Sequence, residues 1–232
     1  MRAEKSGKGR GGPGVAIVDF GLGNLFSVKR ACEQVGMSAE ITGDKGRIAS
    51  AAALILPGVG SYGEAMEHLR SLDLIGPIKD FAASGRPLIG ICLGLQLLLT
   101  ESREFGRHKG LGLVPGEVVP FENPRGERSR LKVPQVCWNR IFPGNGAASG
   151  NRGWSGTALE GIEPGEYFYF VHSFFARPER AEVVLSLTDY GGIRFCSGLK
   201  FGNITAFQFH PERSGPGGLE IYSNIKDMLA ET

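Results

Sequence analysis

Segments of strand length alternate with helix-like segments over the first hundred residues, and this alternation constrains the fold more than any other feature. Strand-like segments occupy residues 15–19, 38–42, 53–56 and 88–91. Helical patterns fill most of the intervals between them. Strands that alternate with helices form a parallel sheet covered by helices on both faces. The sequence therefore predicts an α/β fold, and its 232 residues suit one large domain or two small ones.

The second half of the chain changes character. Six segments there are rich in aromatic and β-branched residues and are expected to be strands: 111–121, 135–138, 167–171, 181–187, 193–199 and 203–209. A helix is expected over residues 215–229, and the glycine-rich residues 143–157 are expected to form a mobile surface loop. We therefore predict an open, mostly parallel sheet flanked by helices, with added antiparallel strands, in one domain over residues 15–232.

Charge and cysteine content disfavour several classes of function. The formal net charge is +2, and residues 1–14 alone carry +3, so the remainder stands at −1. A nearly neutral body gives no reason to expect a nucleic-acid partner, and the apolar runs are too short to span a membrane. We expect residues 1–14 to be a disordered basic tail. The four dispersed cysteines are expected to be free thiols in a cytoplasmic protein that uses no metal and no cofactor.

The most informative motif is Gly90-Ile91-Cys92-Leu93-Gly94, which has the form G-x-nucleophile-x-G. It stands between an apolar strand and a helical run, which is the context of a nucleophile elbow. Backbone N–H groups at the start of a helix would stabilise a thiolate. The N–H of Leu93 would also face an oxyanion formed on an attacked carbonyl. Without this context, Cys92 would be interpreted as a small buried apolar side chain, as are the other three cysteines.

A cysteine nucleophile needs a base, and His210 is the histidine best placed to serve. It follows a strand of the parallel type and begins the sequence His210-Pro211-Glu212. Proline restricts the preceding residue to extended conformations. Glu212 could then reach one ring nitrogen of His210 while the other faces the thiol of Cys92. These residues would form a Cys–His–Glu triad at the carboxyl ends of the strands, where open α/β sheets place their sites.

The remaining histidines and one glycine motif carry less information. His68 and His108 lie among charged residues and are expected at the surface. His172 ends an aromatic strand, and it could be either a core histidine or part of a site. Residues 21–26 (GLGNLF) are similar to the start of a dinucleotide-binding motif, but Phe26 replaces its third glycine, which disfavours NAD binding.

Residues 87–96 (PLIGICLGLQ) and 207–212 (FQFHPE) carry the two proposed catalytic motifs. In order and spacing they resemble the motifs of class I (triad) glutamine amidotransferases. Four further segments are similar to one branch of that family, the glutaminase subunits of imidazole glycerol phosphate synthase from histidine biosynthesis. They are VDFGLGNL at 18–25, LPGVG at 56–60, KVPQVCWN at 132–139 and YFVHSFF at 169–175. The resemblance covers about residues 15–230.

The resemblance implies a glutaminase mechanism. Cys92 would attack the side-chain amide of glutamine, His210 would act as base and then as acid, and Glu212 would orient His210. Ammonia would leave, and water would cleave the glutamyl thioester. Leu93 would supply one oxyanion donor, and Val59 the other, directly or after a peptide flip. The residues implied in binding glutamine are Gly58, Gln96, Ser173 and Phe174.

By the same resemblance, ammonia would pass to a (β/α)8 cyclase subunit in a heterodimer, which makes imidazole glycerol phosphate and aminoimidazole carboxamide ribotide. The chain departs from the family pattern at Gln135 and Cys137, where a histidine and a glycine are usual, in a segment expected near the partner. Two alternatives stay open. One is the glutaminase subunit of another amidotransferase, and the other is a non-catalytic binding or regulatory relative.

Overall fold

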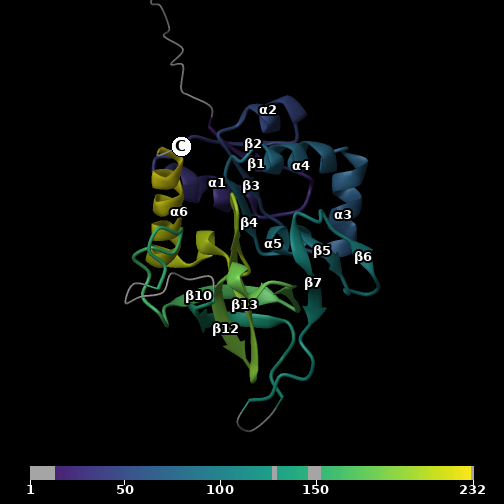
Figure 1. Cartoon of the computed structure of the whole chain (residues 1–232), viewed down its shortest axis with the longest axis vertical. Coiled ribbons are helices and arrows are strands. Elements are labelled where there is room, and N and C mark those ends of the chain that lie inside the picture. The colour runs from purple at the N-terminus through teal and green to yellow at the C-terminus, as the bar shows by residue number, and fades with distance from the viewer. Residues whose placement is uncertain (1–13, 127–129, 146–152, 231–232) are drawn as a thin grey trace, which may run out of the picture.

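The computed structural model describes residues 14–126, 130–145 and 153–230. The first half of the chain builds the parallel part of a large sheet, as the alternating pattern predicts (Figure 1). Its strands are β1 (Val15–Val18), β2 (Ala39–Thr42), β3 (Ala53–Leu56) and β4 (Leu88–Ile91), joined by β14 (Ile204–Phe207) from the end of the chain. They lie in the order β2-β1-β3-β4-β14, and every neighbouring pair is parallel.

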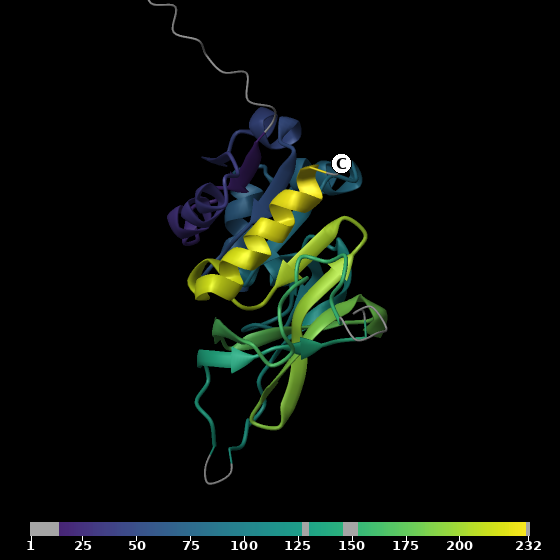
Figure 2. The ribbon, with the colours of Figure 1, turned by 90° about the vertical axis from the view of Figure 1, so that its left-hand side faces the viewer.

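Helices cover both faces of these strands. The helices are α1 (Leu25–Gln34), α2 (Lys45–Ser50), α3 (Tyr62–Ser71), α4 (Ile75–Ala83), α5 (Leu93–Leu97) and α6 (Gly215–Ala230). Alternate side chains of β1 divide between two cores: Ala16 and Val18 pack with α2 to α5, whereas Val15 and Ile17 pack with α1 and α6. Figure 2 shows α6 running along its face of the sheet. The central strands β1, β3 and β4 are buried and apolar along their whole length, which is why they could be predicted from composition.

The remaining strands form a second, largely antiparallel part, of which β7, β10, β12 and β13 lie toward the bottom of Figure 1. They are β5 (Leu99–Ser102), β6 (His108–Lys109), β7 (Val114–Pro120), β9 (Phe142–Pro143), β11 (Phe174–Pro178), β12 (Val184–Tyr190) and β13 (Ile193–Phe201). Strand β13 pairs with β14 and so joins the two parts of the sheet. Strands β8 (Gln135–Arg140) and β10 (Tyr167–His172) form a separate antiparallel ribbon. The predicted fold class is confirmed.

Several local predictions differ from the structure. The residues expected to begin a strand at 181 first make a short 3-10 helix, η1 (Ala181–Val183). Strands β5 and β11 and helix α2 were not predicted. Strand β11 follows β10 after the single residue Ser173, so the aromatic run gives no sign of the break. Only one residue separates the two strands, yet β11 pairs in the large sheet and β10 in the ribbon.

The interpretation of residues 143–157 as a mobile surface loop is wrong where the structure describes them. Phe142–Pro143 pairs with β12 as strand β9. The ring of Trp154 is buried, and its Nε1–H donates a 2.8 Å hydrogen bond to the carbonyl oxygen of Leu185. A buried indole with a satisfied N–H anchors this segment to the core. Residues 146–152 lie outside the described residues.

The predicted basic tail also lies outside the described residues, except for Gly14, whose carbonyl accepts a 3.0 Å hydrogen bond from the N–H of Ala52. All four cysteines are free thiols, as expected. Across the part of the chain that the structure describes, no helix is both long and apolar enough to cross a membrane.

Candidate active site

Cys92 lies on a sharp turn between β4 and α5. Its backbone has φ 54° and ψ −108°, a conformation that non-glycine residues rarely adopt and that is strained. The surrounding glycines are sterically required. A Cβ atom at Gly94 would collide with the carbonyl oxygen of Leu56, and one at Gly90 would lie only 2.9 Å from Cβ of Ala206. The G-x-C-x-G pattern therefore forms a nucleophile elbow, which presents the thiol at the carboxyl end of the sheet.

The proposed base comes from the neighbouring strand. Ile91, the last residue of β4, lies opposite Phe207, the last residue of β14. The N–H of Cys92 donates a 2.7 Å hydrogen bond to the carbonyl oxygen of Phe207. His210 follows three residues later, and its N–H donates a 3.0 Å hydrogen bond to the carbonyl of Tyr169. Strand pairing thus brings Cys92 and His210, the proposed nucleophile and base, to the same edge of the sheet.

Glu212 reaches His210, but by a different backbone path from the one predicted. His210 is extended, with φ −104° and ψ 94°, as the following proline requires. Residues Pro211–Arg213 then form a 3-10 turn, η2, instead of continuing the extended chain. From this turn the Oε1 atom of Glu212 lies 2.8 Å from Nδ1 of His210. Since a carboxylate only accepts, Nδ1 carries the proton, and Nε2 is the nitrogen free to act on a substrate.

Both side chains are enclosed by protein: 4% of the His210 side chain and 1% of the Glu212 side chain are exposed. Burial alone would lower the pKa of His210. The negative charge of Cys92 and the hydrogen bond and charge of Glu212 oppose this effect and raise that pKa to about 10. A positively charged imidazole beside Cys92 would stabilise a thiolate there, the reactive form of a cysteine.

The turn at residues 57–60 faces the elbow. The N–H of Leu93 donates a 3.4 Å hydrogen bond to the carbonyl oxygen of Gly58. That oxygen and the N–H of Val59 belong to one peptide unit and point in opposite directions. In the conformation described, a carbonyl rather than the Val59 N–H therefore faces Leu93. Gly60 has φ 108°, and a Cβ there would meet no atom within 4 Å, so this turn has room to move.

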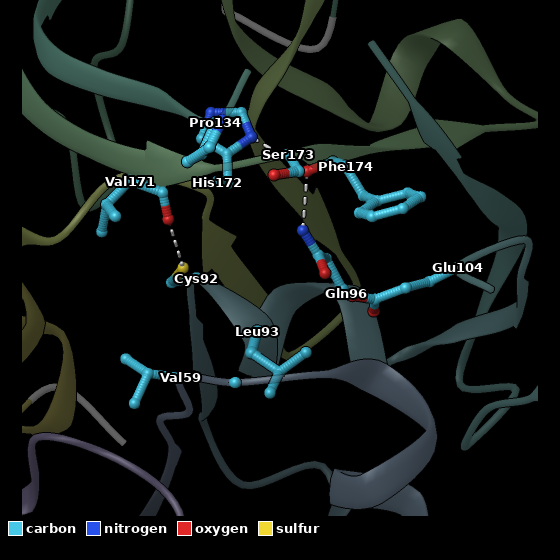
Figure 3. A pocket seen from close by; sticks show the side chains of 11 residues that line it. Val59, Cys92, Leu93, Gln96, Glu104, Pro134, Val171, His172, Ser173 and Phe174 are labelled. Carbon is cyan, nitrogen blue, oxygen red and sulfur yellow. Dashed lines mark hydrogen bonds between the residues drawn. The ribbon is translucent and has the colours of Figure 1, made fainter. Parts of the chain in front are cut away.

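A cavity of about 250 Å³ opens beside Cys92 (Figure 3). Gln96 forms part of its wall, and its Nε2 donates hydrogen bonds of 2.8 Å to the carbonyl of Phe174 and 3.1 Å to Oε1 of Gln208. Opposite the elbow, Ser173 and Phe174 line the cavity from the connection between β10 and β11. Of the predicted site residues, the structure places these on the cavity: Val59, Cys92, Leu93, Gln96, Ser173 and Phe174.

Several cavity or site residues were missed by sequence reasoning. Glu104 lines the cavity, and its Oε2 accepts a 2.7 Å hydrogen bond from the N–H of Tyr62. Burial raises the pKa of this carboxyl, while the Tyr62 N–H acts against that shift. Pro134 lies at the cavity, and Nε2 of Gln208 lies 3.8 Å from Sγ of Cys92. Gln208 alone carried a signal, since a polar residue within a buried strand is unusual.

The other histidines lie outside the triad. His172 is buried and also lines the cavity: its Nδ1–H donates a 2.9 Å hydrogen bond to the Phe174 carbonyl, and its ring packs against Phe121 and Phe195. His68 and His108 are half-buried rather than at the surface as predicted. Within the described ranges, no three His, Cys, Asp or Glu side chains are grouped so that they could hold a metal ion.

Comparison with known proteins agrees with this geometry. The family model "Glutamine amidotransferase class-I" matches residues 16–227. The chain belongs to the class I glutamine amidotransferases. Within this family, imidazole glycerol phosphate synthase subunit HisH of Rhodopirellula baltica is 47% identical over 217 residues, covering 94% of this amidotransferase and 98% of the relative. Subunit HisH of Syntrophotalea carbinolica is 44% identical, with coverages of 92% and 100%. This amidotransferase is therefore a member of the HisH branch.

Solved structures share the fold of this amidotransferase at lower identity. A chain of the PurLQS structure from Thermotoga maritima matches with a TM-score of 0.69 at 20% identity, covering 94% of this chain and 100% of that one. A crystal structure of a glutamine amidotransferase matches with a TM-score of 0.65 at 20% identity, with coverages of 94% and 99%. The architecture of the class I amidotransferase is thus common to proteins that differ in four of five residues.

Proposed function

We propose that this chain is the glutaminase subunit of an imidazole glycerol phosphate synthase, which hydrolyses glutamine and passes the ammonia to a cyclase subunit. One observation carries the proposal. Cys92 and His210 stand at the ends of two hydrogen-bonded parallel strands, with Glu212 on the ring nitrogen that does not face the thiol. The names of the HisH relatives support the choice among amidotransferases.

The chemistry would follow from this arrangement. The Cys92 thiolate attacks the side-chain amide carbon of glutamine, and the carbonyl oxygen becomes an oxyanion. As the C–N bond breaks, His210 transfers its Nε2 proton to the leaving nitrogen, and ammonia departs. Water then attacks the thioester with neutral His210 as base, which releases glutamate and regenerates the thiolate. Glu212 holds His210 in one tautomer through both steps.

The cavity offers matching groups for the amino-acid end of glutamine. Figure 3 places Cys92 and Glu104 on opposite sides of the cavity, with Gln96 between them and Ser173 and Phe174 above. Polar groups on this side suit the charged α-amino and α-carboxylate groups, and the Glu104 carboxylate suits the ammonium. With that end held, the side-chain amide would extend toward Cys92.

The turn at residues 57–60 would act as a brake on hydrolysis. With the Gly58 carbonyl directed at the Leu93 N–H, the oxyanion finds a carbonyl where it needs a donor. Rotation of the Gly58–Val59 peptide would replace that carbonyl by the Val59 N–H. One missing oxyanion donor costs on the order of 10²–10³ in rate. We propose that the partner, with its own ligand bound, favours the rotated peptide.

An exposed apolar face beside the cavity supports a partner subunit at this place. Val136, Trp138 and Tyr167 project from the outer face of the β8–β10 ribbon and are about half exposed. Val133, next to the cavity-lining Pro134, is exposed as well. Aromatic anchors of this kind are typical of protein interfaces. The free thiols support our further proposal that the complex works in the cytoplasm.

The decisive experiment compares glutamate formation by the isolated chain and by its complex with a (β/α)8 cyclase subunit from the same source. We expect the complex with a cyclase-site ligand to hydrolyse glutamine at least about 10²-fold faster than the chain alone. A cyclase variant that cannot bind the chain is the matched control and should leave the rate unchanged. A fully active isolated chain, indifferent to every partner, would instead indicate a free-standing glutaminase.

A further inference from the structure

One oxygen of the triad carboxylate is not accounted for by the mechanism. Glu212 Oε1 contacts His210, but Oε2 is buried, and no described residue makes a hydrogen bond to it. The hydroxyl of Tyr222 on α6 is buried in the same way, again without a hydrogen-bond partner among the described residues. A buried polar atom without a partner is costly, so pairs of complementary atoms of this kind are informative.

Helix α6 directs Tyr222 toward the turn that carries Glu212. Gly218 packs directly on η2, since a Cβ there would collide with the carbonyl oxygen of Pro211. Tyr222 lies four residues later, on the same helix face one turn along. Side chains on a helix lean toward its N-terminus, so the Tyr222 ring leans back toward η2. The ring is 1% exposed, and no solvent competes for its hydroxyl.

The two atoms are also complementary in charge and hydrogen-bonding role. Burial and the negative charge of Glu212 raise the pKa of Tyr222 well above its ordinary value, with a smaller contribution from Cys32 on α1. The hydroxyl therefore keeps its proton and is a donor, whereas the carboxylate oxygen can only accept. No direct hydrogen bond joins Tyr222 to Glu212 among the contacts of the described residues. A single water between them would satisfy both atoms.

We propose that Tyr222 is a positioning residue of the triad, and that its hydroxyl donates through one buried water to Oε2 of Glu212. This contact would fix the plane of the carboxylate, so that Oε1 stays on Nδ1 of His210 during turnover. Tyr222 would thus act on Cys92 only through Glu212 and His210. The inference rests on the proposed glutaminase function of the same site.

The test measures glutaminase kinetics of the cyclase complex with Tyr222→Phe, alone and combined with Glu212→Gln. We expect Tyr222→Phe to lower kcat about 3- to 10-fold with an unchanged KM, as for the loss of one hydrogen bond of ordinary net strength. In the Glu212→Gln background the same substitution should cost less than about 2-fold, because the contact is already lost. Thr188→Val is the matched control, since it removes another buried, unpartnered hydroxyl on β12 and should change neither background.

An unchanged kcat for Tyr222→Phe would overturn the proposal, as would an equal loss in both backgrounds, which indicates a general effect on packing. A crystal structure of the unaltered complex gives a test that does not depend on a variant. An ordered water within hydrogen-bond distance of Tyr222 and Glu212 supports the proposal, and a dry gap contradicts it. Failure of the glutaminase function itself would show separately, as an unaltered complex that does not hydrolyse glutamine.

Discussion

Two buried histidines stand in the two parts of the molecule, and their environments favour opposite charge states. His210 follows the parallel strand β14, and His172 ends the antiparallel strand β10. They are almost equally buried, at 3% and 6% exposure. Yet the pKa of His210 is raised to about 10, whereas burial lowers that of His172 to about 4, despite its hydrogen bond to the Phe174 carbonyl.

The difference shows that burial alone does not decide the charge of a histidine, because negative neighbours can outweigh it. His210 touches a carboxylate and lies near a thiol, both of which favour the imidazolium. His172 packs among phenylalanine rings, which leave burial unopposed by any negative charge. The parallel part thus supplies reactive side chains. The antiparallel part supplies a wall that contacts Cys92 and Gln96 through the backbone carbonyls of Val171 and Phe174.

The largest expected effect comes from removing the reactive partner on the parallel side. Cys92→Ala should reduce glutamine-dependent turnover of the complex by about 10⁴-fold or more, as for other nucleophiles of catalytic triads. Turnover with added ammonium salt should survive, since the cyclase site would lie on the proposed partner subunit. Product formation with each nitrogen source is the measurement. Loss of both activities in a folded, associated variant would contradict this division of labour.

The second-largest loss of activity is expected from removing the Glu212 carboxylate, which contacts His210 and has no counterpart beside His172. Glu212→Gln should keep the fold but lose control of the tautomer and charge of His210. We expect kcat for glutamine to fall by about 10²- to 10³-fold, less than the roughly 10⁴-fold seen for a serine triad. Glu182→Gln, on an exposed ion pair with Arg180, is the control and should have no effect. Unchanged kinetics for Glu212→Gln would remove this residue from the mechanism.

A smaller effect is expected where the two parts meet. Gln96→Leu removes the hydrogen bond from α5 to the Phe174 carbonyl, and with it the link that holds the antiparallel wall beside the elbow. We expect KM for glutamine to rise about 10-fold, while kcat changes much less. Steady-state kinetics of the complex separate the two constants. A loss confined to kcat would place Gln96 in the chemistry instead of in binding.

Substitution of His172 is expected to have the smallest effect on the kinetics. The quantity to measure there is the pH dependence of the free energy of unfolding. The folded pKa of His172, about 4, lies below the ordinary 6.5, so the unfolded chain binds the proton first as the pH falls. Stability is therefore complete above about pH 6.5, declines below it, and has lost up to about 3 kcal/mol at pH 4 from this group. His172→Asn keeps a donor for the Phe174 carbonyl but does not titrate. Urea unfolding from pH 7 to pH 4 should then show a shallower decline, and equal slopes would contradict this assignment.

The reactive side chains could be predicted from the sequence because their chemistry depends on residue type. Cysteine between spaced glycines and histidine before proline leave a pattern, and the structure brings Cys92, His210 and Glu212 together as predicted. The residues that form the wall of the cavity show no such pattern in the sequence. The contacts of this wall use backbone atoms of Val171 and Phe174, which any residue type provides. Glu104 was missed for a related reason, since one carboxylate in a charged run looks like a solvated residue.

Backbone conformation was the other limit of prediction. The PGVG sequence indicated a turn whose glycines permit two orientations of the Gly58–Val59 peptide. Because the residues do not choose between them, the orientation at Gly58 comes only from the structure. Glu212 was predicted to reach His210 along an extended chain and does so from a 3-10 turn. Trp154, placed in a glycine-rich stretch, gave no indication that its partner would be Leu185.

The hydrogen bond from the Cys92 N–H to the Phe207 carbonyl has a consequence for how such an enzyme can change over evolution. It anchors the nucleophile to the strand that leads to the base, so the separation of the two depends on sheet register. The turn at residues 57–60 lies outside that register and is joined to the elbow by the hydrogen bond from the Leu93 N–H to the Gly58 carbonyl. Substitutions in the turn can therefore change how strongly the rate of glutamine hydrolysis depends on a partner, while the relative positions of Cys92 and His210 stay the same.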